Sequence, residues 1–200
     1  MPTAAIVEKP AYLGLLNAIS LAETSAGIYL NAWAAVTPDA DLAATLRLVA
    51  ARETSHGDLF CRRLCELGYG LRQKADPAAE KRLAKLGDPS VSDLEKVGPK
   101  RAGSGDPFAE IKAQMAQDRF DPMTCSLLSW YIGEEVDSAR RLDEAYGRVR
   151  ARANGSAHKA NGHGGTMEGP SADAQAIMAC MTAGFARLEK SFEKLAKAVK

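Results

Sequence analysis

A carboxylate and an imidazole stand three residues apart in the middle of an expected helix, and both are side chains that bind metal ions. These residues, Glu53 and His56, fall on the helix face that otherwise repeats apolar side chains: Leu42, Leu46, Val49, Phe60 and Leu64. Burial of a carboxylate and an imidazole is costly unless each finds a partner. A metal ion is one such partner, and a hydrogen-bonded Glu–His pair is the other.

A second carboxylate falls on the apolar stripe of the preceding segment. Residues 10–36 predict a long helix that follows a short tail, residues 1–9. Glu23 completes the spacing of its apolar stripe, which consists of Tyr12, Leu16, Ile19, Ala26, Leu30 and Trp33.

The turn after this helix brings the two carboxylates to a similar depth. Thr37 and Pro38 predict the start of a second helix over residues 38–67, with Thr37 as the capping hydroxyl and Pro38 as the first helical residue. Two long helices joined by so short a turn form an antiparallel hairpin. Glu23 lies about fourteen residues before Thr37 and Glu53 about sixteen after it.

A third carboxylate falls on the apolar face of another long helix that Asp121 and Pro122 start. Glu135 shares that face with Thr124, Leu128, Tyr131, Ser138, Leu142 and Ala145. One step along a helix rotates a side chain by about 100°, so Glu134 is the alternative inward residue, and we prefer Glu135. Asp118, at the end of a short helix that starts at 106–107, is a further candidate acid or else a surface residue.

The remaining segments are connections and one last helix. Residues 68–105 predict a long crossover, rich in proline, glycine and mixed charge, with helical turns near 78–86 and 90–97. Residues 151–170 predict a flexible linker from their composition. Residues 171–200 predict an amphipathic helix that either completes a bundle with residues 10–150 or forms an interaction tail.

Composition narrows the class of protein. The 200 residues are 46% hydrophobic and 26% charged, which suits one compact domain. The net charge is +1, from 26 basic and 25 acidic residues, so global charge indicates no nucleic-acid partner. We find no leader sequence and no uninterrupted apolar run of about 18 residues, and we therefore expect a cytoplasmic protein without a membrane span.

Charge balance favours a cation among the inward-facing residues. Glu23, Glu53 and Glu135 carry three negative charges against at most one positive charge on His56, and no lysine or arginine falls on the same stripes. The countercharge must come from protons or from a metal. Carboxylate oxygens and an imidazole nitrogen in a helical bundle core suit iron or manganese.

These residues resemble the ferritin-like, rubrerythrin-related four-helix proteins. The resemblance rests on Glu23, on Glu53-x-x-His56 and on the run Leu128-Ser-Trp-Tyr-Ile-Gly-Glu-Glu-Val-Asp-Ser138. It implies an all-α bundle with a long crossover, a carboxylate-bridged di-iron site and ferroxidase, peroxidase or oxygenase activity. The chain departs from that pattern in one of two ways. If Glu135 belongs to a second E-x-x-H motif, Ser138 stands in place of its histidine; if Glu135 is instead the single carboxylate of its helix, the last helix offers no ligand over residues 177–188. We therefore expect one ion or an unevenly held pair.

The resulting expectation is a non-haem metalloprotein that binds iron or manganese through Glu23, Glu53, His56 and Glu135, reacts with dioxygen or peroxide and forms a homo-oligomer. The sequence does not identify a redox partner. The alternative is a metal-free helical bundle that serves as an oligomerisation or partner-binding module.

Overall fold

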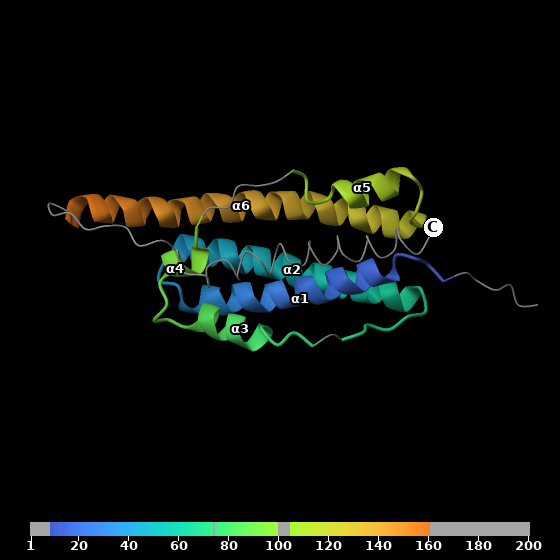
Figure 1. Ribbon diagram of the computed structural model, residues 1–200, viewed down its shortest axis with the longest axis horizontal. Helices are drawn as coiled ribbons and strands as arrows, with labels where there is room; N and C mark the ends of the chain where they lie inside the picture. The colour runs from blue at the N-terminus through green and yellow to red at the C-terminus, as the bar shows by residue number, and fades with distance from the viewer. Residues whose placement is uncertain (1–8, 74, 100–104, 161–200) are drawn as a thin grey trace, which may run out of the picture.

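The computed structural model describes residues 9–73, 75–99 and 105–160, and within these ranges the fold is all α, as predicted. In the described part of the chain, three long helices run along the longest axis of the molecule, and three short ones flank them (Figure 1). The helices are α1 (Leu13–Val36), α2 (Ala40–Glu66), α3 (Ala79–Gly87), α4 (Asp93–Val97), α5 (Ala109–Ala116) and α6 (Pro122–Ala160).

The helices α1 and α2 form the predicted antiparallel hairpin. The predicted cap of α2 is wrong by two residues, because the N-cap is Asp39, whose carboxylate accepts hydrogen bonds from the backbone N–H groups of Asp41 and Leu42. Thr37 instead ends α1, and its hydroxyl donates to Asp93 Oδ2 at 2.6 Å. The turn therefore also holds the start of α4.

Two glycines let α1 and α2 approach closely. A Cβ atom at Gly27 would lie 2.4 Å from Thr54 Oγ1, and one at Gly57 would lie 2.3 Å from Thr24 Oγ1. Any side chain at either position would collide with the facing helix. The two helices therefore approach closely beside Glu23 and Glu53.

The crossover between α2 and α6 is partly helical. Its helices α3 and α4 confirm the predicted helical turns near 78–86 and 90–97. α3 packs on α1, on the side away from α6, and α4 contacts α6 (Figure 1). The Trp33 indole donates a 2.7 Å hydrogen bond to Asp93 Oδ1 and so fastens α4 to the hairpin.

The long helix α6 packs along α2 and extends further than expected. Asp121 caps its start by accepting from the N–H groups of Met123 and Thr124. The helix continues to Ala160, so the predicted linker is wrong for residues 151–160. Alanine and arginine in this stretch favour the helix enough to offset its glycine. Residues 161–170 and the predicted helix 171–200 lie outside the described residues.

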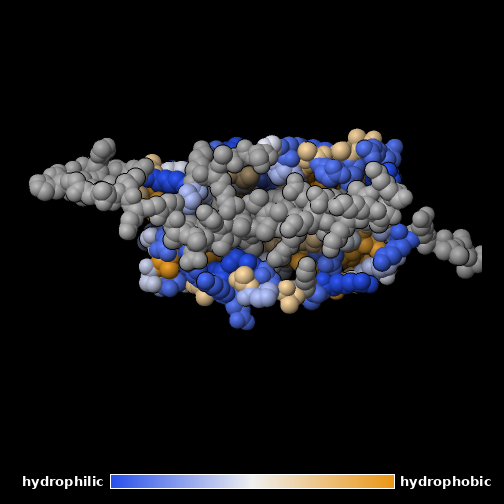
Figure 2. Space-filling view, in the orientation of Figure 1, coloured by the Kyte–Doolittle hydropathy of each residue, from blue (hydrophilic) through white to orange (hydrophobic). Residues whose placement is uncertain are grey.

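The core consists of two apolar clusters separated along the molecule. Each long helix contributes to both clusters and carries buried polar residues between its two contributions. On α1, for example, Leu16 and Ile19 belong to one cluster and Trp33 to the other, with Glu23 between them. On the coloured part of the face shown in Figure 2, hydrophilic residues predominate and hydrophobic ones form smaller patches among them. The candidate site is therefore a polar layer inside an otherwise apolar core.

Among the described residues, α1 is the one helix whose length and composition would let it cross a membrane. Half of that stretch is buried against the rest of the fold, as in the core helix of a soluble protein. A signal sequence near an N-terminus passes the same test, so the cytoplasmic expectation stays a prediction.

Candidate metal centre

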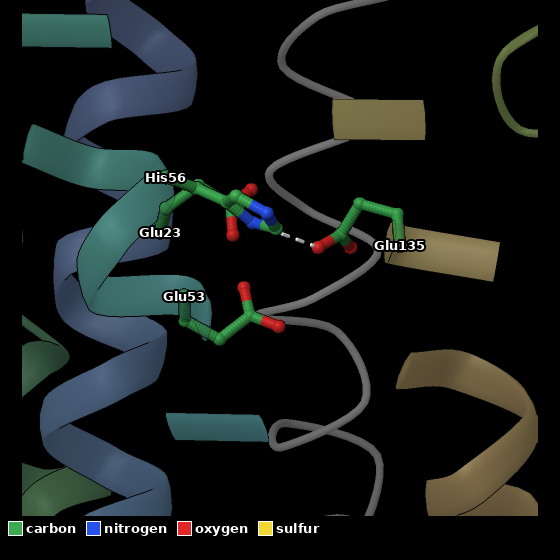
Figure 3. Close-up of side chains that lie close together, drawn as sticks. All are labelled: Glu23, Glu53, His56 and Glu135. Carbon is green, nitrogen blue, oxygen red and sulfur yellow. Dashed lines mark ion pairs between the residues drawn. The ribbon is translucent and has the colours of Figure 1, made fainter. Parts of the chain in front are cut away.

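The polar layer contains the four predicted residues. Glu23 comes from α1, Glu53 and His56 from α2 and Glu135 from α6, and all four are buried. Each offers one donor atom, and these atoms all lie within 4.8 Å of one another. Figure 3 shows the four side chains converging on one volume between the hairpin and α6. The geometry therefore brings the predicted set together, and its role as a ligand set stays a prediction.

A repeated pattern positions the two acids of the hairpin. The segments Glu23-Thr-Ser-Ala-Gly27 and Glu53-Thr-Ser-His-Gly57 match at four of five positions. In each segment, the glycine packs against the threonine of the other segment, so the two segments contact each other in the same way from both sides. The repeat was not predicted, although the E-T-S-x-G pattern is visible in the chain. Ala26 stands where the second copy has His56.

Three donor atoms of the layer lack a hydrogen-bond partner among the described residues. They are Glu53 Oε1, His56 Nδ1 and Glu135 Oε1, and all three are buried. A buried polar atom without a partner costs about 1–3 kcal/mol. Two of these atoms, His56 Nδ1 and Glu135 Oε1, lie 3.3 Å apart. A bound cation would satisfy the carboxylate oxygens and a neutral imidazole nitrogen together, so these residues fit a metal ion.

The third acid of the layer, Glu23, accepts a hydrogen bond from a tyrosine. The Tyr131 hydroxyl donates a 2.7 Å hydrogen bond to Glu23 Oε1. Burial, together with the nearby charges of Glu23 and Glu135, raises the pKa of Tyr131 well above its usual value. Tyr131 therefore keeps its proton and acts as a donor to Glu23.

Burial also shifts the titration of the acids themselves. It raises the pKa of Glu23 and of Glu53, and in both cases the charge of Glu135 adds to the shift. Burial lowers the pKa of His56, but contacts with Glu135 and Glu134 outweigh it and leave the pKa raised. The layer therefore binds extra protons when no other cation neutralises it.

Both neighbouring acids of α6 touch His56, although our sequence analysis treated them as alternatives. The Glu135 side chain is 8% exposed and faces the layer, in agreement with its choice as the inward residue. The Glu134 side chain is 29% exposed. Glu134 Oε2 nevertheless lies 3.0 Å from His56 Nε2. Asp118 is exposed and lies outside the group of four.

An arginine at the edge of the layer was not predicted. Arg52 Nη1 donates to Asp137 Oδ2 at 2.8 Å and to the Ser138 hydroxyl at 3.2 Å, and Arg52 Nε lies 3.8 Å from Glu134 Oε1. Arg52 is one residue before Glu53 on α2 and therefore lies beside the apolar stripe, not on it. Periodicity alone did not indicate that it would reach the layer. Ser138 is thus bonded to Arg52, at the position where a second E-x-x-H motif would have histidine.

Comparisons with known protein families, curated proteins and solved structures find no match for this chain. The ferritin-like resemblance thus rests on the motif residues alone.

The donor set has a definite chemical preference. Three carboxylates and one imidazole are hard or borderline ligands, and the group of four contains no thiolate. Such a set suits Fe²⁺ and Mn²⁺ and disfavours soft ions such as Cu⁺. The donor atoms lie within 4.8 Å of one another, which is close enough for a metal ion to be held among them.

Proposed function

We propose that this protein is a ferritin-like non-haem metalloprotein that binds iron or manganese through Glu23, Glu53, His56 and Glu135. The observation that carries the proposal is a layer of four buried residues whose ligand atoms lie within 4.8 Å of one another. Three of these residues, Glu53, His56 and Glu135, each have a buried side-chain atom without a hydrogen-bond partner among the described residues. A cation would neutralise the carboxylates and would satisfy those donors in one step.

The proposal gives each side chain a separate task. Glu53 and His56 lie one turn apart on α2 and would bind the same ion. Glu23 would bind from α1 with its other oxygen, because Oε1 already accepts from Tyr131. Glu135 would complete the set from α6. A bound ion of this kind supplies redox reactivity toward dioxygen or peroxide, and the apolar clusters on both sides of the layer exclude bulk water.

The ferritin-like topology belongs to the proposal as well. The helices α1, α2 and α6 supply three long helices, and the crossover that carries α3 and α4 joins the hairpin to α6. A homo-oligomer as the assembled form is also part of the proposal. The inference from topology to chemistry is one of analogy.

Elemental analysis of protein purified without added metal and without an affinity tag tests the proposal. We expect about one equivalent of iron or manganese per chain, lost in a Glu53→Ala, His56→Ala double variant. Glu144→Ala is the matched control, because Glu144 is a 54% exposed acid on α6 that pairs with Arg140.

A parent protein without metal, even after anaerobic incubation with ferrous ion, would contradict the proposal. That result would favour the metal-free bundle, in which protons neutralise the layer and the fold serves as an oligomerisation or partner-binding module.

A further inference from the structure

The two ring nitrogens of His56 face different carboxylates. Nε2 lies 3.0 Å from Glu134 Oε2, and Nδ1 lies 3.3 Å from Glu135 Oε1. Only the first contact has hydrogen-bond geometry, since Nδ1 has no hydrogen-bond partner among the described residues. Figure 3 shows the contact on the Nδ1 side, where the ring faces the layer.

Aromatic neighbours hold the His56 ring in place. The ring is fully buried and makes edge contacts with Trp130, at a centroid distance of 5.1 Å, and with Tyr131, at 5.0 Å. The interplanar angles are 84° and 87°. A ring held in this way has little freedom to exchange its two nitrogens by a flip, so the position of its proton decides which nitrogen can bind a metal.

The other carboxylate oxygen of Glu134 lies near an arginine. Arg52 Nε lies 3.8 Å from Glu134 Oε1, and the Arg52 guanidinium is bonded to Asp137 and Ser138. The carboxylate of Glu134 therefore lies between a guanidinium and the Nε2 edge of the imidazole. Glu134 is partly exposed, so water can solvate its carboxylate. Glu135 is buried and its carboxylate has little access to water.

We propose that Glu134 is a positioning residue, which fixes His56 as the Nε2–H tautomer and so presents Nδ1 as the ligand atom. A neutral imidazole carries one N–H, and Glu134 accepts it at Nε2, which leaves the Nδ1 lone pair aimed into the layer. This inference rests on the proposed function for the role of Nδ1. Glu134 itself does not bind the metal.

The tautomer can be read directly in the metal-free protein. We would label the histidines with ¹⁵N, assign His56 from a His56→Gln variant, and record long-range ¹H–¹⁵N correlations at a pH high enough to leave the imidazole neutral. The parent is expected to show Nε2–H. In Glu134→Ala, we expect the proton to shift toward Nδ1, where Glu135 can accept it. In Glu134→Gln, the amide oxygen still accepts from Nε2–H, so the parent tautomer should return.

Metal affinity gives the second readout. Titration with Co²⁺, followed by visible absorption, should show binding about 10–100-fold weaker in Glu134→Ala and largely restored in Glu134→Gln. Glu144→Ala should match the parent in both measurements. An Nδ1–H tautomer in the parent, or an unchanged tautomer and Co²⁺ affinity in Glu134→Ala, would overturn the positioning role. A parent that shows Nε2–H but binds no Co²⁺ would contradict the metal site while supporting the Glu134–His56 relationship.

Discussion

The Tyr131 hydroxyl donates a 2.7 Å hydrogen bond to Glu23 Oε1 and so joins α6 to α1 across the buried polar layer. Both residues are buried, which makes this bond a contact between helices that water does not weaken. It leaves one oxygen of Glu23 available to the layer.

The Tyr131→Phe variant tests this contact, because it removes the hydroxyl and keeps the ring. Glu23 would lose its donor while staying buried. We expect the metal-free protein to lose about 1–2 kcal/mol of unfolding free energy, measured in urea. Co²⁺ affinity should fall only a few-fold, because Tyr131 is not a ligand. If Tyr131→Phe lost as much Co²⁺ affinity as the Glu53→Ala, His56→Ala double variant, Tyr131 would contribute to metal binding as much as a ligand does. That result would contradict its role as a residue that only positions Glu23.

Replacing Glu53 by an apolar residue should separate stability from metal binding. Glu53 is 1% exposed and its Oε1 has no hydrogen-bond partner in the part of the chain that the structure describes, so Glu53→Met removes a costly buried group. We expect the metal-free variant to be more stable than the metal-free parent by about 1–4 kcal/mol. Added Fe²⁺ or Mn²⁺ should raise the Tm of the parent but leave the variant unchanged. A variant that metal still stabilises would show that the ion binds elsewhere.

Gly57→Ala should weaken the hairpin at the candidate site. The added Cβ would lie 2.3 Å from Thr24 Oγ1 and 3.0 Å from the Thr24 backbone nitrogen, so the helices must move apart. We expect a loss of about 1–3 kcal/mol in urea unfolding and weaker metal binding. Gly133→Ala is the matched control, because a Cβ there meets nothing within 4 Å and should stabilise α6 by about 0.5–1 kcal/mol. Equal effects of the two substitutions would contradict the close packing.

Asp121 should make stability depend on acid pH. It accepts hydrogen bonds from Tyr12, Arg63 and Thr124. Burial raises its pKa, but the bonds from Thr124, Tyr12 and Arg63 outweigh burial and leave the pKa below the ordinary 3.8. A lowered pKa stabilises the fold above the pKa of the unfolded chain, and this contribution is lost as pH falls toward the folded value.

The Asp121→Asn variant measures that contribution. The difference in unfolding free energy between parent and variant should be constant from neutral pH down to about pH 5 and should shrink below about pH 4. Urea unfolding of both proteins across this range is the measurement. A difference that stays constant into strong acid would show that the hydrogen bonds do not depend on the Asp121 charge.

Helical periodicity alone predicted which way the four donor residues face. Glu23, Glu53, His56 and Glu135 each complete an apolar stripe, and the short turn at Thr37 brings Glu23 and Glu53 to matching depth. These features are local, because they depend on spacing within a helix and on the length of one turn. The structure buries all four residues in one layer.

The contacts that hold this layer could not be predicted in the same way. The bonds from His56 to Glu134 and from Arg52 to Asp137 join α2 to α6, and they depend on how those helices are rotated and displaced relative to each other. Periodicity predicts which residue of a helix faces inward only to within about one position. It therefore could not predict that both Glu134 and Glu135 reach His56. The continuation of α6 to Ala160 was missed because glycine and polar composition were given more weight than the alanines.

Anomalous X-ray diffraction at the iron or manganese absorption edge, on crystals of protein grown with that ion, tests the central claim most directly. We predict one anomalous peak per chain, bounded by Glu23, Glu53, His56 Nδ1 and Glu135, and absent from crystals of Glu53→Met. A structure without a peak among these four residues, or with the ion bound only elsewhere on the chain, would contradict the metal centre.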